Sequence, residues 1–152
     1  MAVANFLLRT AALGVEVDVR EMDDTTHTAV EAATALGTTV AAIVKSLLFR
    51  IDGDAPLLVL ASGPNRVDTR LLGELVGGAI AMADAKSVKL VTGYSIGGVP
   101  PFGHPERLRT IIDEDLLALP EVWAAAGSAT AVFGIEPHRL AELTNATVAR
   151  VS

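Results

Sequence analysis

The stretch VKSLLFRIDGDAPLLVLA, residues 44–61, predicts a β-hairpin. Residues 44–51 form a run with strand character, and residues 56–61 form a second run that is apolar throughout. Between the two runs, Asp52-Gly53-Asp54 has the composition of a tight turn. We therefore expect the two runs to pair as neighbouring strands of a sheet.

Helix and strand signals alternate on both sides of this hairpin. Thr28-Ala29-Val30-Glu31 is a capping box that opens a helix, and Gly37 is its expected end. Similar signals predict further helices over 2–13, 68–76, 84–92 and 136–144, with short helical turns after Thr39 and at 113–115. Strands are predicted over 16–21, 79–82, 108–112, 122–126, 129–135 and 146–151. This mixed order predicts the α/β (or α+β) class, with a curved mixed β-sheet rather than a regular doubly wound one.

Length and composition limit the kinds of protein to consider. A chain of 152 residues predicts one domain, residues 1–152, with a core of Val, Leu, Ile and Ala because aromatic residues are few. The sequence has no cysteine, which excludes disulfides, thiolate catalysis and cysteine-ligated zinc. No apolar run approaches the ~18 residues of a membrane-spanning helix, and the first residues lack a signal-peptide pattern. We expect a cytoplasmic protein.

The charge is unevenly distributed along the chain. A net charge of −6 argues against broad nucleic-acid binding. From Lys45 to Arg109, however, eight Lys and Arg stand against six Asp and Glu, so this segment is mildly basic. A chance distribution and a local site for an anionic ligand explain this mildly basic segment equally well.

The segment GYSIGGVPPFG, residues 93–103, combines four glycines with two adjacent prolines. Neither a helix nor a central strand tolerates that composition. Pro100 and Pro101 stiffen the segment, while Gly97 and Gly98 expose backbone N–H groups. Such donors suit a developing oxyanion, a carboxylate or a phosphate, although a purely structural crossover would also fit.

Lys45 and the histidines are the candidate side chains for chemistry. Lys45 begins a strongly apolar strand, so its ammonium either extends to water or holds an anionic or carbonyl oxygen in a cleft. His27, His104 and His138 lack metal-ligand spacing, which disfavours a zinc site, but His27 and His104 border loops and could line a cleft. The sequence contains no G-x-S-x-G nucleophile motif and no phosphate-binding or dinucleotide-binding loop.

Four segments in order resemble the YbaK-like aminoacyl-tRNA editing domains, which are related to the editing domain inserted in bacterial prolyl-tRNA synthetases. The segments are HTAVEAATALG (27–37), IVKSLLFR (43–50), TGYSIGGVPPFG (92–103) and RTIIDEDL (109–116). The resemblance implies an α/β domain whose curved mixed sheet is flanked by helices. It also implies hydrolysis of amino acids wrongly esterified to tRNA, most often the tRNA for proline, without a cofactor or metal.

The resemblance also assigns roles to individual residues. The essential lysine of the family falls on Lys45, and its G-x-x-x-P loop falls on residues 97–101. In that role the N–H groups of Gly97, Gly98 and Val99 would stabilise the oxyanion, and water or a group of the substrate would attack. The expected substrate-binding residues are Ser46, Tyr94, Pro100, Pro101, Phe102, Gly103 and His27. Pro100 removes one possible donor. The resemblance implies tRNA for proline carrying cysteine, alanine or another small amino acid, and Ser46, where alanine-clearing relatives tend to have Asn, favours cysteine or another small side chain.

The expected partner is the acceptor end of an aminoacylated tRNA, with prolyl-tRNA synthetase as a candidate second partner. Six basic residues are candidates for contact with the tRNA: Arg66, Arg70, Lys86, Lys89, Arg107 and Arg109. Two alternatives remain from the sequence: a non-catalytic module that binds a small anionic ligand or a tRNA end, and an ester hydrolase unrelated to tRNA.

Overall fold

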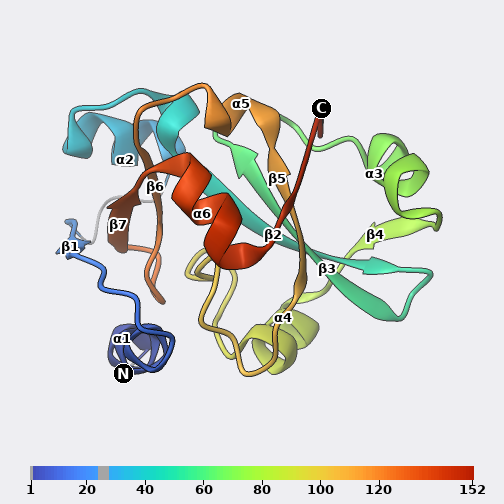
Figure 1. Cartoon of the computed structure of the whole chain (residues 1–152), viewed down its shortest axis with the longest axis horizontal. Coiled ribbons are helices and arrows are strands. Elements are labelled where there is room, and N and C mark those ends of the chain that lie inside the picture. Colours follow the sequence, from blue (N-terminus) through green and yellow to red (C-terminus); the bar gives the residue numbers. More distant parts are fainter. Residues whose placement is uncertain (1, 24–27) are drawn as a thin grey trace.

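The computed structural model describes residues 2–23 and 28–152, and its largest element is a mixed five-stranded sheet (Figure 1). The strand order is β4 (Ile80–Met82), β2 (Val44–Ile51), β3 (Ala55–Ser62), β5 (Arg109–Asp113) and β8 (Thr147–Ala149). Strands β4, β2 and β3 pair antiparallel, whereas β3, β5 and β8 run parallel. The predicted hairpin is confirmed, because β2 and β3 pair from Val44 opposite Ser62 to Ile51 opposite Ala55.

A three-stranded antiparallel sheet lies beside the larger one. Its order is β1 (Val19–Glu21), β7 (Ala131–Ile135) and β6 (Val122–Ala125). Figure 1 shows this sheet at the opposite end of the molecule from β4 and α3 (Thr69–Val76). A parallel bridge between Ile43 and Trp123 links the two sheets. The predicted α/β class is confirmed, with the strands divided between two sheets that meet at this bridge.

The helices begin and end at the residues that favour those positions. The Thr28 N-cap of the predicted capping box is present, since Thr28 Oγ1 accepts a hydrogen bond from the Glu31 N–H at 3.1 Å, and Gly37 ends α2 in the left-handed region. Thr39 precedes the 3₁₀ turn η1, but its side chain makes no capping hydrogen bond to the described residues. The bounds are α1 Ala2–Ala12, α2 Ala29–Leu36, η1 Val40–Ala42, α4 Ala85–Thr92, α5 Glu114–Leu117 and α6 Pro137–Thr144. None of the helices described is long and apolar enough to cross a membrane.

Strand β3 is buried on both faces of the large sheet. Leu58 and Leu60 belong to the larger hydrophobic cluster, while Leu57, Val59 and Ala61 face the second cluster, and all five are fully buried. This arrangement explains why residues 57–61 of β3 are all apolar instead of alternating with polar residues. The burial of each leucine stabilises the fold by about 1.5–3 kcal/mol.

The turn between β2 and β3 sets the position of every residue in the hairpin. Asp52 and Gly53 both have positive φ, 53° and 71°, as in a type I′ turn, and the Asp54 N–H donates to the Ile51 carbonyl at 3.0 Å. The resulting register places Lys45 opposite Ala61 near the start of β2. That end of the strand lies next to the bridge to the small sheet.

Candidate active site

Lys45 and part of the glycine-proline loop line one cavity of about 310 Å³. The cavity lies between the start of β2, the beginning of α2 and the small sheet. Lys45 and Ser46 come from β2, and Ile96, Gly97 and Val99 come from the loop. The remaining described lining residues are Met22, Thr28, Ala29, Ala32, Ile43, Val44, Leu47, Trp123, Ala125, Ala129 and Val132. Two segments about fifty residues apart in the sequence therefore meet here, as the resemblance implied.

The Lys45 side chain is partly buried and held in place. Its Nζ donates a hydrogen bond to the backbone carbonyl oxygen of Asn65 at 2.5 Å. Burial lowers the pKa of Lys45 from its ordinary value of 10.5, and the nearby Asp113 carboxylate opposes that shift. The structure thus places an oriented ammonium group at the wall of the cavity.

Ser46 presents a buried hydroxyl beside Lys45. Its Oγ has no hydrogen-bond partner among the described residues. A buried hydroxyl without a partner is unfavourable by about 1–3 kcal/mol, so such groups generally have a partner that is not part of the protein chain. Because Ser46 also lines the cavity, a bound molecule is in a position to provide that partner.

The loop reaches the cavity through Gly97 and Val99. Gly98 lies behind them and is buried, and its N–H donates to the Ser95 carbonyl at 3.0 Å within the turn. A Cβ on Gly98 would stand 2.9 Å from both the Gly127 carbonyl oxygen and the Ser128 Cα, so this position has no room for a side chain. The N–H groups of Gly97 and Val99 have no partner within the described part of the chain. Of the three predicted donors, Gly97, Gly98 and Val99, these two therefore remain open to a ligand.

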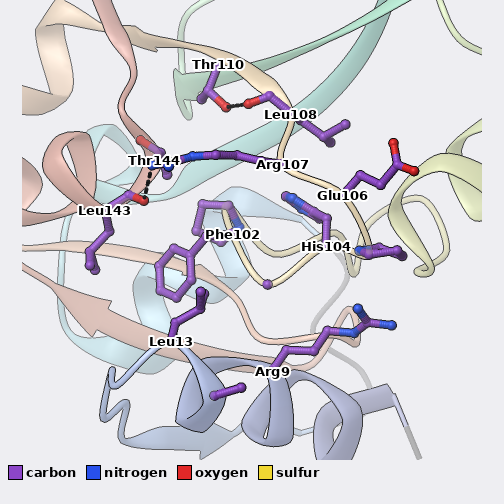
Figure 2. A pocket seen from close by; sticks show the side chains of 14 residues that line it. Arg9, Leu13, Phe102, His104, Glu106, Arg107, Leu108, Thr110, Leu143 and Thr144 are labelled. Carbon is purple, nitrogen blue, oxygen red and sulfur yellow. Dashed lines mark hydrogen bonds between the residues drawn. The ribbon is translucent and has the colours of Figure 1, made fainter.

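The second half of the loop faces another cavity, of about 420 Å³ (Figure 2). Pro101, Phe102 and Gly103 line it, and Figure 2 shows Arg9 and Arg107 on opposite sides of Phe102. Tyr94 is buried below the surface, with its hydroxyl donating to the Gly103 carbonyl at 3.4 Å. These four residues of the predicted set, Tyr94, Pro101, Phe102 and Gly103, do not line the Lys45 cavity.

Pro100 marks the point where the loop passes from one cavity to the other. It is buried and lines neither cavity, and its carbonyl oxygen lies 2.7 Å from His104 Nε2. Since a carbonyl can only accept, His104 Nε2 carries the proton. Burial lowers the pKa of His104, although the bond to Pro100 opposes that shift. His138 is exposed on α6, and His27 lies outside the described residues.

Two features of the site were missing from the sequence prediction. The β6–β7 hairpin contributes Trp123, Ala125 and Val132, which were predicted only as strand residues. Asn65 was predicted only as part of a loop, although its carbonyl binds Lys45. Within the described ranges, no group of three His, Asp or Glu side chains is placed to hold a metal ion.

Comparison with known proteins decides the family. The family model described as the aminoacyl-tRNA editing domain matches residues 23–143 of this chain. The chain belongs to the aminoacyl-tRNA editing domain family. Its activity is accordingly that of an aminoacyl-tRNA deacylase, which hydrolyses the ester between an amino acid and tRNA.

Individual relatives of this editing domain agree with the assignment. A solved structure described as a candidate trans-editing enzyme for prolyl tRNA synthetase is 41% identical, with a TM-score of 0.95 over 99% of this chain and 96% of that one. The uncharacterized protein YwhH of Bacillus subtilis (strain 168) is 32% identical over 129 residues, which are 85% of this chain and 82% of YwhH. The proline–tRNA ligase of Maridesulfovibrio salexigens is 37% identical over 92 residues, which are 60% of this chain but 16% of the ligase.

Proposed function

We propose that this editing domain acts in trans on the tRNA for proline when it carries cysteine, alanine or another small amino acid. The observation that supports the proposal is the convergence of Lys45, the Ser46 hydroxyl and the Gly97 and Val99 N–H groups on one cavity of about 310 Å³. The 41% identical trans-editing candidate and the proline–tRNA ligases support the choice of tRNA.

The reaction needs few groups from the protein. In the proposed mechanism, a water oxygen attacks the ester carbonyl carbon, and the resulting oxyanion is stabilised by the N–H groups of Gly97 and Val99. The bond from that carbon to the ribose oxygen then breaks, and the ribose oxygen takes a proton, which releases the free amino acid and intact tRNA. The ester is already activated, so orientation and charge stabilisation supply the needed acceleration without a protein nucleophile.

Lys45 holds the substrate in this scheme. Its ammonium has hydrogen-bonding capacity left after the bond to Asn65, because –NH₃⁺ has three donors. A backbone oxygen of the amino acid or the terminal phosphate of the tRNA would accept from it. The Ser46 hydroxyl, which lacks a partner among the described residues, would bind a polar atom of the same substrate.

In this proposal, selectivity among amino acids comes from the lining of the cavity. Ala125, Ala129 and Val132 contribute small apolar surfaces to its wall. A methylene group changes binding by only about 1–3 kcal/mol, which is why a synthetase that activates a smaller amino acid by mistake needs a separate editing site. In this proposal the apolar wall admits small side chains and disfavours the proline ring.

The test is a panel of tRNA for proline charged with Cys, Ala, Ser and Pro, with loss of the ester followed over time. We expect hydrolysis of at least one small-residue ester and none of the Pro ester. Lys45→Ala should remove the activity, whereas Arg139→Ala, at an exposed position of α6, should retain it. Stoichiometric binding without turnover, in protein shown to be folded, would overturn the proposal.

A further inference from the structure

The buried carboxylate of Asp113 is connected to Lys45 through the loop that follows β3. Asp113 is the last residue of β5 and is only 1% exposed. Its Oδ2 accepts hydrogen bonds from the Ser62 N–H at 3.0 Å and from Asn65 Nδ2 at 2.8 Å. Its Oδ1 accepts from the Asp115 N–H at 3.0 Å, which caps α5. A helix cap needs only that last bond, so the two bonds to the neighbouring loop require another explanation.

The bonds to Asp113 fix the loop at both of its ends. The Ser62 and Asn65 groups share one carboxylate oxygen, and the Asn65 N–H also donates to the Ser62 carbonyl at 2.9 Å. The Ser62 hydroxyl anchors the same turn to η1 by donating to the Ala41 carbonyl at 2.6 Å. Gly63 packs against the Val40 carbonyl so closely that a Cβ would not fit. The loop therefore has little freedom to move.

The consequence of this anchoring is the direction of one carbonyl group. With its side chain held by the buried Asp113 and, on the exposed side, by Asp115 Oδ2 at 2.7 Å, Asn65 presents its backbone oxygen to Lys45 Nζ at 2.5 Å. The ammonium is thereby held at the cavity wall by a neutral acceptor, and the Asp113 carboxylate lies on the other side of Asn65. Direct pairing with a carboxylate would instead form an ion pair and occupy donors that the substrate needs.

We propose that Asp113, acting through Asn65, is the positioning residue that holds the Lys45 ammonium in the orientation needed for editing. This proposal rests on the function proposed above for Lys45. Asp113 itself touches neither the cavity nor the substrate, and it acts by fixing the loop and by supplying a nearby negative charge.

The experiment measures the titration of the Lys45 ammonium by NMR. The chain has three lysines, Lys45, Lys86 and Lys89, so their side-chain NMR signals can be assigned by single Lys→Arg variants. In the unmodified protein we expect Lys45 to titrate below its ordinary value, because burial lowers its pKa. Asp113→Asn should lower the pKa of Lys45 further, because it removes the charge that opposes the effect of burial.

Two further variants keep the test decisive. Asn65→Ala retains Asp113 but removes the side chain that links Asp113 to the loop, and it should reduce kcat by about 10- to 100-fold because the ammonium that orients the substrate is misplaced. Glu114→Gln is the matched control, since Glu114 is exposed next to Asp113 in the sequence and its side chain is not among the partners of Asn65, and it should behave as the unmodified protein does.

The outcomes separate this proposal from the proposed function. An unchanged Lys45 titration and an unchanged kcat in folded Asp113→Asn and Asn65→Ala proteins would overturn the positioning role. If Asp113→Asn does not fold, Asn65→Ala decides the question alone. If the unmodified protein hydrolyses no aminoacyl-tRNA, the proposed function fails, while the lysine titration still shows whether Asp113 acts on Lys45.

Discussion

Gly98 and Gly127 approach so closely that a Cβ on Gly98 would stand 2.9 Å from the Gly127 carbonyl oxygen. The loop that carries the candidate oxyanion donors and the hairpin of the small sheet are therefore in backbone contact. This contact joins two walls of the Lys45 cavity, one containing Gly97 and Val99 and the other containing Trp123 and its neighbours. Changes at this contact should alter the geometry of the site.

Gly98→Ala should reduce deacylation by at least about tenfold, because the added methyl pushes the loop away from the hairpin and displaces the donors. Overpacking should also lower the free energy of unfolding by about 1–3 kcal/mol. The matched control is Gly73→Ala on α3, where a Cβ would stand 2.8 Å from the Gly78 carbonyl oxygen. Helix α3 lies at the opposite end of the molecule from the small sheet that lines the site (Figure 1). Urea unfolding and initial rates check both variants, and equal activity losses in the two would contradict the explanation.

Phe102→Ala should destabilise the protein by about 3–5 kcal/mol. The Phe102 ring packs against Phe6 and Phe133 with ring centroids 5.8 Å and 5.6 Å away, and it is 5% exposed. Thermal unfolding measures the effect, with Leu90→Ala as the control because Leu90 is 79% exposed. A fall in stability of less than about 1 kcal/mol would show that the loop is anchored by other contacts.

Deacylation should decline on the alkaline side as Lys45 loses its proton. Burial lowers the pKa of Lys45 below 10.5, so the loss of activity begins at a lower pH than an exposed lysine would allow. Arginine stays protonated throughout this range, so any residual activity of Lys45→Arg should not show the decline. Initial rates need correction for spontaneous ester hydrolysis at each pH. A decline of the same shape in both proteins would mean that another group is responsible.

Acid should destabilise the protein through His104. Burial lowers the pKa of His104 below its ordinary value of 6.5, so the folded state binds fewer protons than the unfolded state at acid pH. The contribution of His104 is therefore complete above pH 6.5 and is lost as the pH falls toward its lower folded value. Urea unfolding between pH 7.5 and about 5 should show a smaller decrease for His104→Gln. Identical slopes in the unmodified protein and in His104→Gln would refute the assignment.

Local signals were enough to predict most of the elements. The Asp-Gly turn and the flanking apolar runs predicted the β2–β3 hairpin, and the Thr28 capping box and Gly37 predicted α2. Both predictions were possible because each feature depends on residues that are neighbours in the sequence. The pairing of Lys45 with the glycine loop came from a resemblance to known editing domains. No local rule brings together two segments fifty residues apart.

The parts that could not be predicted depend on long-range packing. In sequence, Val99 and Phe102 look like equivalent residues of one loop, but they face different cavities. Phe102 turns away from Lys45 because its ring finds Phe6 and Phe133, which come from α1 and β7. The Asn65 carbonyl likewise faces Lys45 from a loop that is bonded to Asp113, 48 residues further along the chain, through the Asn65 side chain.

The exposed turn at Asp52 and Gly53 has a consequence for how relatives of this protein can diverge. Solvent-exposed turns usually tolerate the gain or loss of residues during evolution. Here one extra residue in either strand next to the turn would shift the register that sets Lys45 opposite Ala61, and a shift of one position turns a side chain to the other face of the sheet. A relative that changes the length of this hairpin must therefore compensate with a bulge before the lysine, or lose the lysine from the cavity.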